Sequence, residues 1–178
     1  MMTAPAQARA QSRWSADLGF GAANVAGGNY SARSRWDLGG RIGYRAATVF
    51  GTDVVLGASM QHVWADRPVA IAYPAAAPCP SFGCRFLPTA PNVPNFNYEA
   101  ATLGIRRHVG SATLGLEGGV GSVDVADAGR RLGVSGGADV GLQLGGSVWL
   151  VLRGEILSWT EGGNTLYAYP ITIGLRVN

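Results

Sequence analysis

The sequence predicts an all-β protein, an eight-stranded antiparallel up-and-down β-barrel that spans a membrane. Three observations predict it. Apolar residues alternate with small or polar ones over eight long segments, and only 14% of the 178 residues are charged, against roughly 25% in soluble domains. No run of about 18 apolar residues could form a transmembrane helix. A closed barrel is the other structure that satisfies every backbone polar group in lipid.

Each predicted strand is long enough to cross a bilayer, which takes about 9 to 11 residues. Strands in soluble proteins are mostly about 5 to 6 residues long. The predicted strands are Trp14–Val25, Arg35–Ala46, Thr52–Trp64, Phe96–Arg107, Ala112–Val125, Arg131–Leu144, Ser147–Trp159 and Thr165–Asn178. The barrel therefore occupies 14–178, and residues 1–13 precede it.

Long and short connections alternate along the chain. The long ones are Ala26–Ser34, Ala65–Asn95, Ala126–Arg130 and Thr160–Asn164, and the short ones are Ala47–Gly51, His108–Ser111 and Gly145–Gly146. Outer-membrane barrels have long external loops and short periplasmic turns. This alternation predicts that both termini lie in the periplasm and that Ala65–Asn95 is a long external loop.

The two faces of the strands predict which side meets lipid. In the last strand, Ile171, Ile173 and Leu175 share one face, while Gly174 and Arg176 share the other. Small residues suit the crowded interior of a narrow barrel, and large aliphatic residues suit lipid. A soluble lipocalin-like barrel is the rival fold, but it would turn the aliphatic face inward and leave the charges outside.

Ten charged residues fall on the predicted inner face, five acids and five arginines. They are Asp17, Asp37, Arg41, Arg45, Arg106, Glu117, Asp139, Arg153, Glu155 and Arg176. Unpaired charges in a narrow lumen are costly, so we expect them to pair. Counting back from the loops places Asp17 near Arg41, Glu117 opposite Asp139, and Asp139 near Arg153. We expect Asp17, Arg41, Arg106, Glu117, Asp139 and Arg153 to form a mid-lumen plug; the alternative is a gated ion path.

Aromatic residues gather near the predicted strand ends, as in the interfacial girdles of membrane barrels. Trp14 and Tyr44 are expected at the periplasmic rim. Trp36, Trp64, Tyr98, Trp159 and Tyr167 are expected at the external rim. The ordinary β-propensity of aromatic residues is the alternative explanation.

The long loop and the N-terminus carry further signals. Cys79 and Cys84 are a close pair suited to a disulfide in an oxidising compartment, and no metal site is expected. Tyr73, Phe82 and Phe86 in the same loop are candidate contacts for a partner, or they fold over the barrel mouth. Near the N-terminus, 6–8 and 8–10 are small-x-small triplets, which indicate either the tail of an export signal or a disordered terminus.

These features resemble the small outer-membrane β-barrel family that includes the OmpA transmembrane domain and OmpX. The resemblance rests on the eight alternating strands, the glycine-rich inner face and the final strand, 169–178. That strand resembles the C-terminal signal read by the barrel-assembly machinery, although family members usually end on an aromatic residue and this chain ends on Asn178. The resemblance implies location in the bacterial outer membrane, contact with its lipid and lipopolysaccharide, and an anchoring, adhesion or interaction role.

The motifs argue against other functions. Lysine is absent, which excludes a phosphate-binding GxxxxGK[ST] loop, and no basic patch of the nucleic-acid-binding kind occurs. His62 is expected to face lipid near the external rim, and His108 to be solvated in a periplasmic turn. We therefore predict no catalysis and no cofactor. The leading function is a structural, adhesive or partner-binding role at the cell surface, the second a narrow pore for small solutes or ions, and the third a lipid-modifying enzyme.

Overall fold

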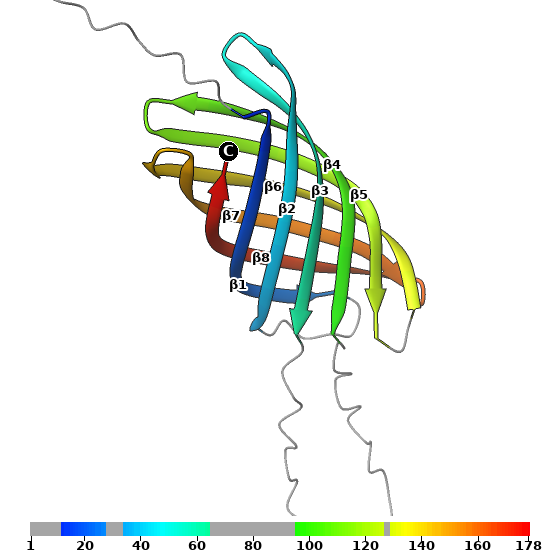
Figure 1. The fold of residues 1–178 in the computed structure, drawn as a ribbon. Coiled ribbons are helices and arrows are strands. Elements are labelled where there is room, and N and C mark those ends of the chain that lie inside the picture. Colours follow the sequence, from blue (N-terminus) through cyan, green and yellow to red (C-terminus); the bar gives the residue numbers. More distant parts are fainter. Residues whose placement is uncertain (1–11, 28–33, 65–94, 127–128) are drawn as a thin grey trace, which may run out of the picture.

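The computed structural model describes residues 12–27, 34–64, 95–126 and 129–178. These residues form eight antiparallel strands, each paired with its sequence neighbours, and β1 also pairs with β8 to close the barrel (Figure 1). The strands are β1 Trp14–Ala26, β2 Ser34–Val49, β3 Thr52–Trp64, β4 Phe96–Val109, β5 Ala112–Val125, β6 Gly129–Gly145, β7 Val148–Glu161 and β8 Asn164–Val177. The predicted fold class is confirmed. No helix in the described ranges is long and apolar enough to cross a membrane.

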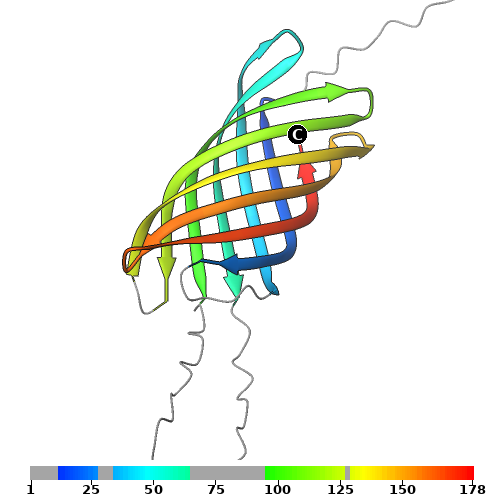
Figure 2. The same cartoon turned by 180° about the vertical axis from the view of Figure 1, so that it is seen from behind.

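The barrel has two different ends. The tight β2–β3, β4–β5 and β6–β7 turns lie at the end that also holds the C-terminus, which we call the turn end (Figures 1 and 2). The opposite end, which we call the loop end, holds the strand ends that flank 28–33, 65–94 and 127–128. The strands therefore have the up-and-down order that the sequence predicts.

The strand pairing fixes the tilt of the barrel. A path along paired residues starts at Ser15 and returns to β1 at Val25, ten residues further on. Its steps are Ser15, Gly43, Gly57, Thr102, Gly119, Ser135, Leu157, Ala168 and Val25. For eight strands, this stagger tilts each strand by roughly 40° from the barrel axis and leaves an interior that side chains fill.

Close backbone approach explains some of the interior glycines. A Cβ atom added to Gly174 would overlap the Leu18 carbonyl oxygen, and one added to Gly121 would overlap that of Glu99. Only glycine allows the neighbouring strands to lie this close at these points. The glycine-rich inner face is therefore a packing feature.

The β2–β3 hairpin extends further than the sequence predicts. β2 continues to Val49, and a bulge between Arg45 and Ala47 shifts its register. The turn is reduced to Phe50 and Gly51, whose φ angles are 50° and 76°, as in a type I′ hairpin turn. Phe50 is 97% exposed at the tip, and this hairpin projects beyond its neighbours in Figure 1.

The outer surface of the barrel is a continuous apolar band. One outward residue from each strand illustrates it, and each is 40–64% exposed: Leu18, Leu38, Leu56, Leu103, Leu116, Val134, Leu152 and Ile173. Soluble monomers rarely expose apolar patches larger than a few hundred Å². The band matches the predicted lipid-facing side of the strands.

Candidate functional site

The barrel interior is the candidate site, and it has three layers. A polar vestibule lies at the turn end, ion-paired clusters fill the middle, and an apolar layer fills the loop end. All ten charged residues assigned to the inner face lie there in the alternating burial pattern of their strands. Arg35, Asp53 and His108 also lie on the inner face, and the sequence analysis did not place them inside.

The first ion-paired cluster is built around Asp17 of β1. Arg176 of β8 donates from Nε to Asp17 Oδ1 over 2.8 Å and from Nη2 to Asp17 Oδ2 over 3.0 Å. Arg153 of β7 donates to the same carboxylate over 2.5 Å. Arg176 also reaches Asp139 Oδ1 of β6 over 3.0 Å. The Arg176 side chain is completely buried; these carboxylates satisfy its Nε and Nη2, while Nη1 has no hydrogen-bond partner among the described residues.

The second cluster crosses the lumen around Arg41 of β2. Its guanidinium group pairs with Glu117 of β5 and, over 2.6 Å, with Glu155 Oε1 of β7. Gln61 of β3 donates from its amide to the other Glu155 oxygen. Four strands are thus connected by side chains across the barrel axis.

Two of the three residue pairs expected from hairpin register lie opposite each other, and the third does not. Asp17 does lie opposite Arg41 in the β1–β2 ladder, and Asp139 opposite Arg153 in the β6–β7 ladder. The expectation that Glu117 lies opposite Asp139 is wrong, because Glu117 pairs with Gly137. The centre of the β5–β6 connection lies one residue earlier in the sequence than expected. Each β5 residue therefore pairs with a β6 residue two positions earlier than expected.

Two charged groups lack hydrogen bonds within the described part of the chain. Asp37 is fully buried opposite Gly21 and Val63, and neither of its carboxylate oxygens has a hydrogen-bond partner there. Arg106 is only 8% exposed and its Nε lacks a partner. The expected single network is therefore two clusters, and neither Asp37 nor Arg106 is hydrogen-bonded to them.

The apolar layer corrects the girdle assignment. Tyr98 and Trp159 were expected at the external rim, but they are 1% and 2% exposed inside the barrel. The Phe96 and Trp159 rings are tilted against each other, with centroids 5.1 Å apart. Their position near strand ends suggested the rim, whereas their strand parity places them inside: Tyr98 shares its face with Arg106. The other members of the layer are Ala23, Val25, Val63, Ala100, Val123, Val125, Leu157, Leu166 and Ala168.

The other five residues of the predicted girdles lie on the outer rims. At the turn end, the Trp14 and Tyr44 rings are 4.9 Å apart. At the loop end, Trp36 and Trp64 are 59% and 39% exposed. His62 lies outside beside Trp64, with ring centroids 4.4 Å apart, and its Nδ1 is 2.5 Å from Asn97 Oδ1. Tyr167 is likewise exposed on the outside.

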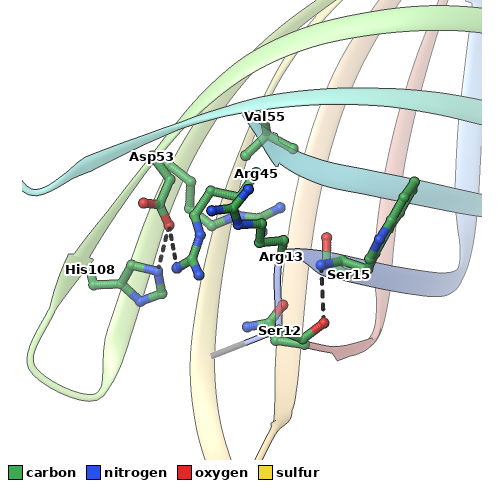
Figure 3. A pocket seen from close by; sticks show the side chains of 10 residues that line it. Ser12, Arg13, Ser15, Arg45, Asp53, Val55 and His108 are labelled. Atoms are coloured by element: carbon green, nitrogen blue, oxygen red, sulfur yellow. Dashed lines mark hydrogen bonds and ion pairs between the residues drawn. The ribbon is translucent and has the colours of Figure 1, made fainter. Parts of the chain in front are cut away.

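The vestibule at the turn end is polar and rich in arginine (Figure 3). Asp53 accepts a hydrogen bond from Thr48 over 2.5 Å and lies 3.4 Å from His108 Nε2 and 3.8 Å from Arg45 Nη1. The expectation that His108 is solvated in a turn is wrong: β4 continues past it, and its side chain turns inward, where it also meets the Trp149 ring. A small cavity of about 20 Å³ lies here, lined by Ser12, Arg13, Trp14, Ser15, Arg45, Asp53, Val55, Arg106, His108 and Asn178.

Several predicted residues lie outside the described residues. They are Tyr73, Phe82 and Phe86, the candidate loop contacts, and Cys79 and Cys84, the expected disulfide. Among the residues that are described, no group of three or more His, Cys, Asp or Glu side chains could hold a metal ion.

Together, the fold and the interior define a closed eight-stranded antiparallel barrel with an apolar exterior and a polar-to-apolar layered interior. Among solved structures the chain is similar to Neisserial surface protein A, NspA, at 11% identity and a TM-score of 0.64, covering 93% of this chain and 97% of NspA. It also matches Ail, the attachment invasion locus protein of Yersinia pestis, at 12% identity and a TM-score of 0.46, covering 93% and 99%. No protein-family model and no curated protein matches the sequence. The NspA likeness supports the barrel fold.

Proposed function

We propose that this chain is a bacterial outer-membrane barrel that anchors an interaction element at the cell surface and whose interior is closed. The apolar outer band carries the membrane part of the proposal. Leu18, Leu116 and Ile173 are each more than half exposed on different walls of the barrel, and lipid is the solvent that such a surface fits. The aromatic pair Trp14 and Tyr44 suits the headgroup level at the turn end.

Two layers of different chemistry support a closed interior. In the middle, Arg41 crosses the lumen to Glu117 and Glu155, so guanidinium and carboxylate groups occupy the barrel axis. Toward the loop end, Tyr98 and Trp159 fill the same axis with rings. An ion would have to break the pairs and then displace closely packed apolar side chains, which is costly. The anchoring role rests on this closure, because a closed barrel has no transport to perform.

The interaction element of the proposal is the segment 65–95, which joins β3 to β4 at the loop end. It contains seven of the nine prolines of the chain, and proline lowers the entropy lost when a segment is ordered on a partner. Tyr73, Phe82 and Phe86 are the proposed contacts. Aromatic residues of this kind are enriched among the side chains that dominate protein interfaces. A disulfide between Cys79 and Cys84 would restrict the same segment.

Membrane insertion is tested first. The chain should require detergent for solubility, and the folded barrel should migrate differently on a gel before and after boiling. Monodisperse, detergent-free protein would refute the membrane location.

Conductance in planar bilayers tests the closure. The wild-type chain should show no steady channels. Arg41→Gln weakens the ion-paired layer and Trp159→Ala weakens the apolar layer, so each alone should stay closed while the double variant conducts. Large steady channels from the wild type would overturn the closed interior and favour a narrow pore for small solutes or ions.

Partner capture tests the loop. Whole chains with and without residues 68–92, the latter joined by a short glycine–serine linker, are compared for binding to cell-surface extracts. A partner held only by the intact chain, and lost in a Tyr73→Ala, Phe82→Ala, Phe86→Ala triple variant, supports the proposed contacts. Equal capture by all three chains would refute them.

A further inference from the structure

The vestibule at the turn end contains a buried guanidinium group that has no hydrogen-bonded partner among the described residues. Arg106 is 8% exposed and lines the vestibule cavity. The hydrogen bonds and ion pairs between described residues include none from its guanidinium group, and Nε is buried without a partner. A buried charge in this state is costly unless something else satisfies it.

The acids within the same half of the barrel are already engaged. Asp53 lies directly opposite Arg106 in the β3–β4 ladder, but its carboxylate is shared by Thr48, His108 and Arg45. Asp17 and Asp139 are held by Arg153 and Arg176. The vestibule therefore offers Arg106 no free side-chain carboxylate.

We propose that the vestibule binds a phosphate-like oxyanion, with Arg106 as the principal ligand. The planar fork of a guanidinium group matches the oxygen edge of such an anion in a bidentate way. Arg45 borders the same cavity, and the Ser15 hydroxyl and Asn178 amide line it and can donate further hydrogen bonds. The enclosed space of about 20 Å³ is room for about one water molecule, so only an oxygen edge of the anion would enter it and the rest of the group would lie in the open turn end.

Two sources could supply this chemistry. A free phosphate ion could enter through the open turn end. Alternatively, the phosphate of a lipid headgroup could reach over the rim, where Trp14 and Tyr44 lie on the outside and Arg13 donates to the Tyr44 hydroxyl over 3.3 Å. Arg106 would recognise the same group in both cases.

The test uses the whole chain in an uncharged detergent, titrated calorimetrically with inorganic phosphate. Arg106→Gln is compared with Arg107→Gln, since the neighbouring Arg107 side chain faces outward. Losing a charge-assisted hydrogen bond costs about tenfold or more in affinity. We expect saturable phosphate binding by the wild type and Arg107→Gln, and binding at least about tenfold weaker by Arg106→Gln.

A second arm identifies the source. The same variants are mixed with phosphatidylglycerol, and native mass spectrometry measures how much lipid each one retains. If lipid retention depends on Arg106 but not on Arg107, and no phosphate binding is seen by calorimetry, the bound group is a lipid headgroup. If phosphate binding and lipid retention both depend on Arg106, the site accepts the phosphate group from either source. If Arg106→Gln does not refold, Arg45→Gln replaces it and should weaken binding in the same direction. Equal binding by the wild type and the inner-face variant in both arms would overturn the proposal.

Discussion

Removal of the Arg176 guanidinium group should be among the most damaging single changes in the barrel. In Arg176→Gln, three hydrogen bonds are lost, two to Asp17 and one to Asp139. Asp17 keeps Arg153, but Asp139 keeps no ion-pair partner among the described residues. Because the site is fully buried, water cannot replace the lost donor, and breaking such a cluster costs about 3–5 kcal/mol.

Urea unfolding of the barrel refolded into lipid vesicles, followed by tryptophan fluorescence, measures this cost. Arg130→Gln is the matched control, since Arg130 and Glu99 are 3.8 Å apart with side chains 66% and 57% exposed. An exposed pair of this kind contributes about 0–1 kcal/mol. If Arg176→Gln changed the free energy of unfolding no more than Arg130→Gln does, the ion pairs inside the lumen would not be stabilising the barrel as argued.

Three further substitutions probe the outer band, the apolar layer and the hairpin tip. Leu116→Arg on the lipid side should cost about 2–4 kcal/mol of unfolding free energy in vesicles; a neutral result would argue against lipid contact there. Trp159→Ala should cost about 3–5 kcal/mol in the same assay because a buried ring leaves a cavity, and a loss below 1 kcal/mol would place the ring outside the packed layer. Phe50→Asn should raise stability by roughly 1 kcal/mol, because asparagine tolerates the positive φ of this turn; a lower unfolding midpoint would contradict the turn assignment.

The strands and their faces could be predicted because each is a local property. Alternation decides the side of every residue, so the inner position of Arg41 and the outer position of Ile42 follow from parity once the strand is recognised. Closeness to a strand end is a weaker guide than parity. It suggests the rim for Tyr98 and Trp159, whereas parity places Tyr98 on the inner face with Phe96, and Trp159 on the inner face with Leu157.

The partners inside the lumen could not be predicted in the same way. Hairpin register relates only neighbouring strands, whereas Arg41 and Glu117 lie on β2 and β5, 76 residues apart. Which residues meet across the axis depends on the stagger accumulated around all eight strands. If the centre of a turn is misplaced by one residue, the residue expected opposite a given position is wrong by two. The expected pair of Glu117 and Asp139 is wrong for this reason, because Glu117 pairs with Gly137.

The cross-lumen contacts also give the absence of lysine a structural meaning. Backbone hydrogen bonds connect each strand only to its two neighbours, so opposite walls are joined by interior side chains alone. Arg176 joins Asp17 of β1 to Asp139 of β6, and Arg41 joins Glu117 of β5 to Glu155 of β7. One guanidinium group can serve two carboxylates in fixed directions, whereas an ammonium group is a point charge on a flexible stem. The fork geometry therefore lets two arginines tie six strands together, and it is this bridging, more than the balance of charge, that connects the opposite walls of the barrel.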